Sequence, residues 1–290
     1  MEYIAHIVIL TLLYVTLATS LRVLVGEIGQ LSFAHAAFYG IGAYTSALLA
    51  TRTDLPFVVA LFASMGVAAL VSLLISVPSL RLYKDYFVLA TFGFPIIMTG
   101  VLTNWSSVTG GPDGISGIPP VMIVDFALHP TASALVLALL IAVCSHLVVR
   151  RLVTSPFGRV LRAIREDEDL VAAYGRNPTT FKISVVAVTS ALAGAAGSIY
   201  AYYIGFIDPS GFTIIESILI LSMVIIGGAR SMWGPVVGAV TLVIFPELLR
   251  FIGIPMSIAA EMRQMLYGLL LVLTMILRPQ GIVGNYRIKQ

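Results

Sequence analysis

The side chains that could do chemistry are few and scattered through an apolar sequence. The four histidines, His6, His35, His129 and His146, are too far apart in the chain to suggest a metal cluster. The single cysteine, Cys144, excludes an intramolecular disulfide, and its apolar surroundings predict a buried, unreactive thiol. No G-x-x-x-x-G-K-[ST], H-E-x-x-H or G-x-S-x-G motif is present. The sequence therefore predicts no catalytic site and no cofactor, and we do not expect an enzyme.

A short polar segment, Gly26–Ser32 (GEIGQLS), interrupts the apolar sequence near its start. Its glycines, carboxylate and amide would expose unsatisfied backbone groups in lipid, so we expect them to face protein or a water-filled path. Ser32 is a candidate N-cap for the helix that follows. Helix starts of this kind commonly face anionic solute groups in transporters. A turn at the membrane surface is the alternative interpretation.

We predict that a solute path runs beside this segment and the helix that follows it. Glycine at positions 40 and 42 would leave space on the next turns of that helix. His35 has no acidic partner at helical spacing, which favours a packing role over solute contact or proton relay. The predicted path residues are Gln30, Ser32, His35, Gly40 and Gly42.

The densest charge lies in one internal segment, Arg150–Lys182, which carries seven of the seventeen Lys and Arg residues and four of the fourteen acids. Ser155-Pro156 predicts an N-cap and a first-turn proline. The acids Glu166–Asp169 favour the start of a second short helix, and Gly175 favours its end. We therefore expect two short helices with a polar outer surface. A plain solvated connector is the alternative, although connectors are commonly only about 2–8 residues long.

The type of fold that holds these residues can be predicted from composition. With 290 residues, 59% hydrophobic, 11% charged and a mean hydropathy of +1.00, the chain is predicted to be an integral membrane protein. Apolar runs of about 17–25 residues recur along it, so residues 1–290 form a single transmembrane domain. The net charge of +3 is explained better by membrane orientation than by nucleic acid, and we expect no nucleic-acid partner.

We expect an all-α, polytopic transmembrane helical bundle of about nine spans. The two segments Glu216–Ile226 and Pro235–Leu249 are short for full crossings, and a re-entrant pair is the alternative. The acids Glu216 and Glu247 lie near predicted helix ends, where exposure or pairing with Arg250 is expected rather than an ion site. The predicted helices are Tyr3–Val25, Ala34–Ala50, Pro56–Val77, Tyr86–Asn104, Thr131–Val149, Ile183–Phe206, Glu216–Ile226, Pro235–Leu249 and Ile258–Leu277.

Orientation follows from the preference of Lys and Arg for cytoplasmic loops. If the segment 150–182 is cytoplasmic, fourteen Lys and Arg residues, including Arg81, Arg287 and Lys289, lie inside and three lie outside. The N-terminus is then outside and the C-terminus is cytoplasmic. The first apolar run, Ile4–Leu21, has no basic residue before it and no small-residue cleavage site after it, so we expect a retained span.

Five segments in the same order carry a family resemblance: Gly26–Ala50, Ser107–Pro119, Ser155–Ile183, Gly227–Ala239 and Leu277–Ile282. Together they resemble the membrane permease subunits of branched-chain amino acid ABC importers, over nearly the whole chain. The resemblance implies an ABC importer permease fold in a bacterial inner membrane, in contact with membrane lipid. It also implies four partner chains, which are a second permease subunit, two ATPase subunits and a periplasmic solute-binding protein.

The same resemblance implies a role for the charged segment 150–182. Part of it corresponds to a cytoplasmic coupling helix that docks on the ATPase. The residues to which the resemblance assigns this contact are Glu168, Asp169, Leu170, Ala172, Ala173, Tyr174 and Gly175.

Two alternatives remain at the level of sequence. A self-sufficient carrier or channel is disfavoured because it needs no such cytoplasmic segment, and because few charges lie within the predicted spans. A permease of the same family for urea, an amide or a nucleoside is not separated from the leading interpretation. Solute choice in these importers rests largely with the solute-binding protein, which is another chain.

Overall fold

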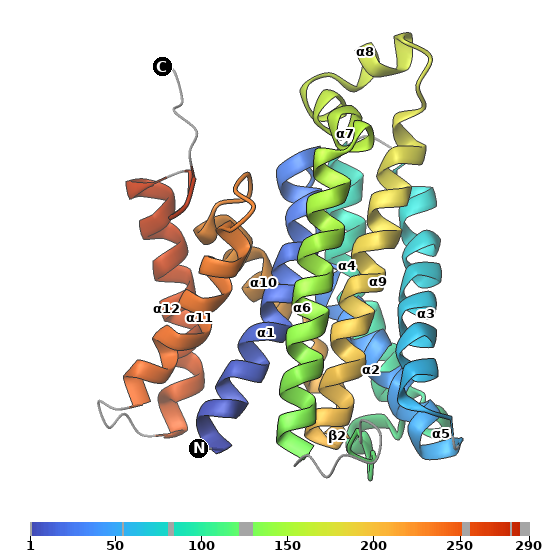
Figure 1. Ribbon diagram of the computed structural model, residues 1–290, viewed down its shortest axis with the longest axis vertical. Helices are drawn as coiled ribbons and strands as arrows, with labels where there is room; N and C mark the ends of the chain where they lie inside the picture. The colour runs from blue at the N-terminus through green and yellow to red at the C-terminus, as the bar shows by residue number, and fades with distance from the viewer. Residues whose placement is uncertain are drawn as a thin grey trace.

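A computed structural model describes residues 2–53, 55–80, 84–121, 130–250, 256–278 and 280–284. Figure 1 shows a bundle of helices that run roughly along one long axis. Four residues that entered the sequence analysis lie outside the described part, namely Arg81, His129, Arg287 and Lys289.

Five helices in the described part are long and apolar enough to cross a membrane: Glu2–Ile28, Phe57–Ser79, Tyr86–Asn104, Thr131–Thr154 and Pro178–Ile204. The first joins α1 (Glu2–Arg22) to a π-helical turn, η1 (Val23–Ile28). The others lie in α3 (Phe57–Ser79), α4 (Lys84–Asn104), α6 (Pro130–Thr154) and α9 (Pro178–Ile204). Large apolar side chains on their outer faces, such as Leu70 and Leu74 of α3, are exposed as a lipid-facing surface requires.

Four further helices lie beside these five: α2 (His35–Arg52), α10 (Ile214–Gly227), α11 (Gly234–Arg250) and α12 (Met256–Leu277). Ile214–Gly227 and Gly234–Phe245 are apolar but shorter than a full crossing. Each predicted helix is therefore present. The largest shifts are at the end of α6, which reaches Thr154 rather than Val149, and at the start of α9, which begins at Pro178 rather than Ile183. That all nine cross the membrane stays a prediction.

Helices α2, α3 and α9 pack side by side and approach closely at small residues. A Cβ on Gly197 would lie 2.0 Å from the backbone oxygen of Tyr39, so only glycine fits there. Ser46 of α2 lies 2.6 Å from the hydroxyls of both Ser64 and Ser198, which connects the three helices by hydrogen bonds. Close backbone approach and buried hydroxyl pairs are the usual means of joining helices in lipid.

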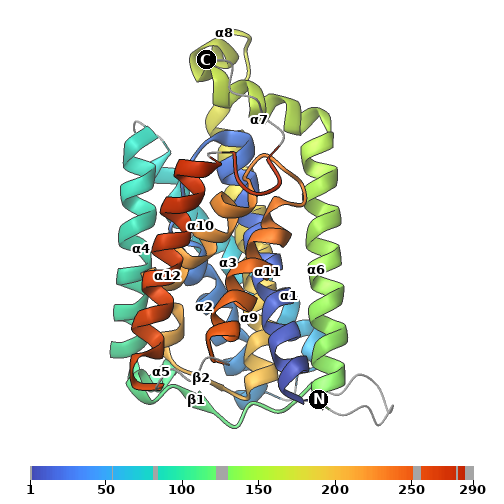
Figure 2. The same cartoon turned by 90° about the vertical axis from the view of Figure 1, so that its left-hand side faces the viewer.

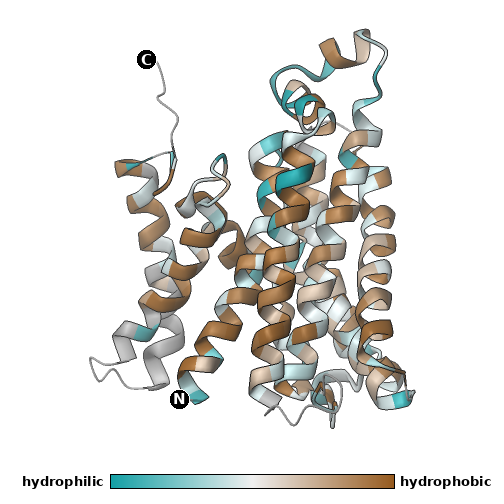
Figure 3. Cartoon of the chain, viewed as in Figure 1, coloured by the Kyte–Doolittle hydropathy of each residue, from teal (hydrophilic) through white to brown (hydrophobic). Residues whose placement is uncertain are grey.

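The two ends of the bundle differ, as Figures 1 and 2 show. One end, called the sheet end, holds the N-terminus, α5 (Ser106–Thr109) and η2 (Gly111–Asp113). It also holds an antiparallel strand pair, β1 (Ile115–Ser116) with β2 (Phe206–Ile207), in which Ile115 lies opposite Ile207. The short helix η3 (Pro209–Phe212) follows from this end and packs against α2 and α4. The other end, called the α8 end, carries α7 (Pro156–Glu166) and α8 (Glu168–Ala173), which project beyond the bundle. In Figure 3 the shafts are mainly hydrophobic and the α7–α8 region carries a concentration of hydrophilic residues.

Three local expectations are wrong. Ser32 is not the N-cap of α2, because that helix begins at His35 with Ala34 as its cap residue, and Ser32 Oγ only accepts from the Ala34 amide at 3.4 Å. Gly26 lies within the helical turn η1, so the interruption is confined to the segment from Gly29 to Ala34, where Gly29 has a φ of 76°. Cys144 is exposed rather than buried, since it lies on an outward face of α6.

Candidate functional site

The projecting segment forms two capped helices, as its sequence predicts. Ser155 Oγ accepts a hydrogen bond from the Gly158 amide at 3.4 Å and caps α7. Asp167 Oδ1 accepts from the Leu170 amide at 2.9 Å and caps α8. Gly175 follows α8 with a φ of 77°, a left-handed conformation that favours glycine.

The outer surface of α8 is open and partly apolar. The Leu170 side chain is 54% exposed and that of Tyr174 is 81% exposed, whereas Val171 points inward and is buried. Asp169, Ala172, Ala173 and Gly175 are also exposed. An exposed leucine and tyrosine flanked by small residues form a surface that can pack against a partner. Of the predicted coupling residues, Glu168 behaves differently, because it binds Lys182 of α9 at 2.5 Å.

A buried group of charges joins this projecting segment to the bundle. The Glu27 carboxylate in η1 lies 3.0 Å from Arg22 Nη2 and 3.1 Å from Arg162 Nη1 of α7. Arg22 and Glu27 are almost completely buried, and Arg22 also donates to the Arg230 carbonyl at 3.1 Å. We call Arg22, Glu27 and Arg162 the Glu27 cluster. It connects η1 and the end of α1 to α7, and through the Arg230 carbonyl also to a third segment far away in the sequence.

Two more contacts support the same junction. Arg165 Nη1 of α7 donates to the Gly26 carbonyl at 2.7 Å, within η1. Arg230, in the loop between α10 and α11, lies 3.8 Å from Glu166. These contacts join α7 to the end of α1 and to that loop. This junction was not predicted from the sequence. Arg22 and Glu27 lie at the end of an apolar run, and such charges indicate that each needs a partner.

The predicted path residues at the start of α2 are buried inside the chain. Gln30, Ser32 and His35 are at most 5% exposed. His35 Nε2 lies 3.1 Å from Ser20 Oγ of α1, which agrees with the packing role favoured by the sequence. The Gln30 side-chain amide has no hydrogen-bond partner among the described residues. A contact of these side chains with solute stays a prediction.

The expectation that Gly40 and Gly42 leave open space is wrong for this conformation. A Cβ on Gly40 would lie 2.7 Å from Cγ of Phe212, and a Cβ on Gly42 would lie 2.2 Å from the backbone oxygen of Gly194. Both glycines allow neighbouring elements of the same chain to approach. Their place in a solute path is untested, and their contacts here are those of helix packing.

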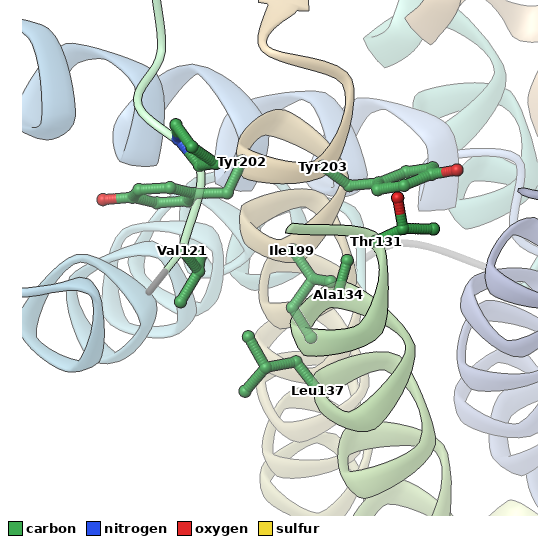
Figure 4. Close-up of a pocket in the computed structure, with 8 residues that line it drawn as sticks. Val121, Thr131, Ala134, Leu137, Ile199, Tyr202 and Tyr203 are labelled. Carbon is green, nitrogen blue, oxygen red and sulfur yellow. The ribbon is translucent and has the colours of Figure 1, made fainter. Parts of the chain in front are cut away.

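A small pocket lies toward the sheet end between α6 and α9 (Figure 4). Its volume is about 60 Å³, comparable with about two water molecules at about 30 Å³ each. In Figure 4 the hydroxyls of Tyr202 and Tyr203 point to opposite sides, away from the apolar lining. Its size makes it a poor candidate for a solute site. The lining residues are Pro120, Val121, Thr131, Ala134, Leu137, Ile199, Tyr202 and Tyr203.

A larger cavity of about 180 Å³ lies between α1, α2, α9, η3 and α10. We call it the central cavity. It is lined by Leu10, Leu13, Tyr14, Leu17, Tyr39, Tyr200, Gly211 and Glu216. The Tyr14 hydroxyl donates a hydrogen bond to the Glu216 carboxylate across it. Glu216 lies in the first turn of α10, near a helix end as its sequence predicts. It is partly buried and borders this cavity. Its predicted pairing with Arg250 is untested, because the Arg250 side chain lies outside the described part.

Known proteins resemble this chain in sequence over most of its length. The family model described as "Branched-chain amino acid transport system / permease component" matches residues 3–275. The chain is 35% identical over 301 residues to the high-affinity branched-chain amino acid transport system permease protein LivM of Escherichia coli (strain K12), covering 96% of this chain and 69% of the relative. It is 36% identical, with the same coverage, to the LivM protein of Salmonella typhimurium.

A second type of relative is more distant. The permease protein LivH of Escherichia coli (strain K12) is 24% identical over 294 residues, which cover 96% of this chain and 93% of the relative. No solved structure matches the chain. The match over residues 3–275 and the LivM identity agree with the multi-pass apolar helices, and the chain therefore belongs to the family of permease components of branched-chain amino acid transport systems.

Proposed function

We propose that this chain is one of two membrane subunits of an ATP-driven importer of branched-chain amino acids and that it forms half of the translocation path. ATP would be hydrolysed by two separate ATPase subunits, and a periplasmic solute-binding protein would deliver the solute. The observation that carries the proposal is the exposed surface of α8, which is anchored through α7 to the bundle by the Glu27 cluster. A coupling helix must present a surface that binds the ATPase subunit. It must also be attached firmly to the transmembrane helices, so that a movement of the ATPase reaches them.

The second membrane subunit is proposed to be of the LivH type. Both LivM and LivH proteins are named as permease proteins of high-affinity branched-chain amino acid transport systems. The chain is 35% identical to LivM and 24% identical to LivH, so it supplies the LivM-type half. Its exposed apolar helices leave room for contact with such a partner and with lipid.

We place the α8 end on the cytoplasmic side of a bacterial inner membrane. Arg22, Arg162, Arg165 and Arg230 gather at that end, whereas Arg52 at the sheet end donates to the carbonyls of residues 107 and 108. The positive-inside rule then puts the N-terminus outside and the C-terminus inside.

The variant Ala173→Arg tests whether α8 docks on an ATPase subunit. Because Ala173 is exposed, arginine there fits within this chain, and any defect arises in the contact with a partner, where overpacking and an unpaired charge each cost about 1–3 kcal/mol or more. We expect insertion and folding to be unchanged and leucine uptake to fall at least about tenfold, together with solute-stimulated ATP hydrolysis. Ala163→Arg, at an exposed position of α7, is the matched control and should transport normally. Normal uptake by Ala173→Arg would refute the assignment.

The orientation is tested by cysteine labelling in a Cys144→Ser background. Asp113 of η2 and Ala172 of α8 are both exposed, and they lie at opposite ends of the bundle. A cysteine at Asp113 should react with an impermeant reagent added outside, whereas one at Ala172 should react only after the cytoplasmic face is opened. The reverse pattern would invert the proposed topology.

A further inference from the structure

We propose that the central cavity is a solute subsite in which the Glu216 carboxylate binds the α-ammonium group of the transported amino acid. The inference rests on the proposed function. It adds the chemical group that recognises the amino acid and the position of that group in the bundle.

Glu216 lies in the first turn of α10 and faces the cavity. The Tyr14 hydroxyl donates a hydrogen bond to Glu216, and no ion pair involves Glu216 among the residues that the structure describes. A carboxylate among membrane-spanning helices is costly unless a cation or donors compensate it. One phenol leaves further acceptor positions on the carboxylate unfilled, because an ionised carboxylate offers about four. A cationic ligand would complete the compensation.

The opposite wall of the cavity is apolar. Leu10, Leu13 and Leu17 are spaced at i, i+3 and i+7 along α1, so they form one continuous helix face, which Tyr14 joins. An aliphatic side chain held against these leucines would be removed from water, whereas its ammonium group would reach Glu216. The cavity thus has the division between apolar and polar surfaces that a branched-chain amino acid requires.

The third wall is aromatic and carries hydroxyl donors. The rings of Tyr39 and Tyr200 lie 5.4 Å apart, and each contacts Phe212, with centroids 5.3 and 6.2 Å away. No hydrogen bond from the Tyr39 or Tyr200 hydroxyl occurs among the described residues. These two phenols are available as donors to the carboxylate of an amino acid. The lining contains no lysine, arginine or histidine that would repel the ammonium group.

The size of the cavity is appropriate for such a ligand. Its volume of about 180 Å³ exceeds the roughly 150 Å³ of an apolar cavity known to hold benzene. It lies where α1, α2, α9 and α10 meet, and these helices are arranged around the middle of the bundle (Figure 2). A weak site at that depth suits a conduit, because solute must leave as readily as it enters.

The first test is uptake by a reconstituted complex of this chain with its second permease subunit, ATPases and solute-binding protein. Glu216→Gln keeps the shape of the side chain and removes its charge. We expect leucine uptake at subsaturating concentration to fall roughly tenfold to a hundredfold, as for loss of one charge-assisted hydrogen bond. Glu247→Gln is the matched control, because Glu247 also accepts from a tyrosine, Tyr3, but does not line the cavity. It should transport normally.

The second test measures occupancy without transport. In a Cys144→Ser background, Gly211→Cys places a thiol at the cavity edge, where an added Cβ meets only Asp208 Oδ1, at 3.8 Å. Leucine should slow labelling of this thiol by a small maleimide, whereas 4-methylpentanoate, which lacks the amino group, should not. Glu216→Gln should abolish the protection by leucine.

The outcomes separate the inference from the proposed function. If the unmodified complex takes up no branched-chain amino acid, the proposed function is wrong. If it takes up leucine, but Glu216→Gln takes up leucine equally well, or if 4-methylpentanoate protects the Gly211→Cys thiol as well as leucine does, the ammonium subsite is wrong. Lost uptake with retained assembly, combined with lost protection, supports it.

Discussion

Two carboxylates among the described residues, the buried Glu27 and the partly buried Glu216, have opposite surroundings. Glu27 at the α8 end is held between two guanidinium groups, at 3.0 and 3.1 Å. Glu216 accepts a hydrogen bond from the neutral hydroxyl of Tyr14 and borders a cavity of about 180 Å³. A carboxylate whose charge is balanced within the chain stabilises a junction. A carboxylate that is left unbalanced beside an open volume is available to a cationic ligand.

The Glu27 cluster also explains why α1 ends in a π-helical turn. Arg22 and Glu27 are five residues apart, and a π-helix has i→i+5 hydrogen bonds that bring such positions onto the same side. In a regular α-helix, residues three or four apart face each other instead. The π-turn thus allows Arg22 to reach Glu27 at 3.0 Å while Arg162 approaches from α7.

The largest effect on stability is expected from Glu27→Gln. It leaves the buried Arg22 guanidinium without its anion, and removing one partner of a buried pair costs about 3–5 kcal/mol. We expect a clear fall in the thermal unfolding temperature of the purified chain, measured by loss of the monodisperse chromatographic peak after heating. Glu166→Gln is the control, because its 3.8 Å pair with Arg230 is largely exposed and should contribute little.

A double variant sharpens this result. Glu27→Met combined with Arg22→Met removes both buried charges, and we expect it to be more stable than Glu27→Gln alone. If the double variant is no better, the fall in stability arises from packing at η1 rather than from an orphaned charge.

The sequence predicted the helices well because their signals are local. Apolar runs, the Ser155-Pro156 start and the Gly175 end can each be read within a few residues, and the structure has helices at all the predicted places. The family was also predictable, from five ordered segments. The predictions that were wrong concern tertiary contacts, that is, which residue from another part of the chain packs against a given residue. Gly40 was expected to leave open space, whereas Phe212, 172 positions later in the chain, fills it.

The two carboxylate sites were missed for the same reason. Arg162 reaches Glu27 across 135 positions and Tyr14 reaches Glu216 across 202, so neither pairing has a local signal. Composition could only show that a charged residue inside an apolar run needs a partner. Which partner it finds, and whether a cavity lies beside it, depends on how the helices pack.

Gly40→Leu links helix packing to the central cavity and has the next largest expected effect. The added side chain would displace Phe212, whose ring contacts Tyr39 and Tyr200 of the cavity wall. Overpacking of this kind costs about 1–3 kcal/mol, and it should also reduce leucine uptake severalfold in assembled complex. Gly66→Leu on the outer face of α3, where an added Cβ meets nothing within 4 Å, should do neither. Normal uptake and stability in Gly40→Leu would show that Phe212 can move without affecting the cavity.

Arg162→Ala is expected to have a smaller effect on stability and a specific effect on coupling. The Arg162 side chain is 48% exposed, so its ion pair with Glu27 contributes at most about 1 kcal/mol. Its removal loosens α7 from η1, and we expect solute to stimulate ATP hydrolysis less while basal hydrolysis is retained. Arg159→Ala, also exposed on α7, is the control. Equal stimulation in both variants would confine the Glu27 cluster to a structural role.

The smallest effect on stability is expected from Glu216→Gln, which is the counterpart of Glu27→Gln. Glutamine still accepts a hydrogen bond from Tyr14 through its carbonyl oxygen, and no lysine or arginine among the described residues loses an ion-pair partner. The uncharged amide of glutamine also costs less free energy to hold away from water than a carboxylate does. We therefore expect the free energy of unfolding to stay within about 1 kcal/mol of the parent, a shift of a few degrees at most, while uptake falls. A loss of stability as large as that of Glu27→Gln would mean that both carboxylates are structural, and the distinction between a balanced and an available charge would not hold.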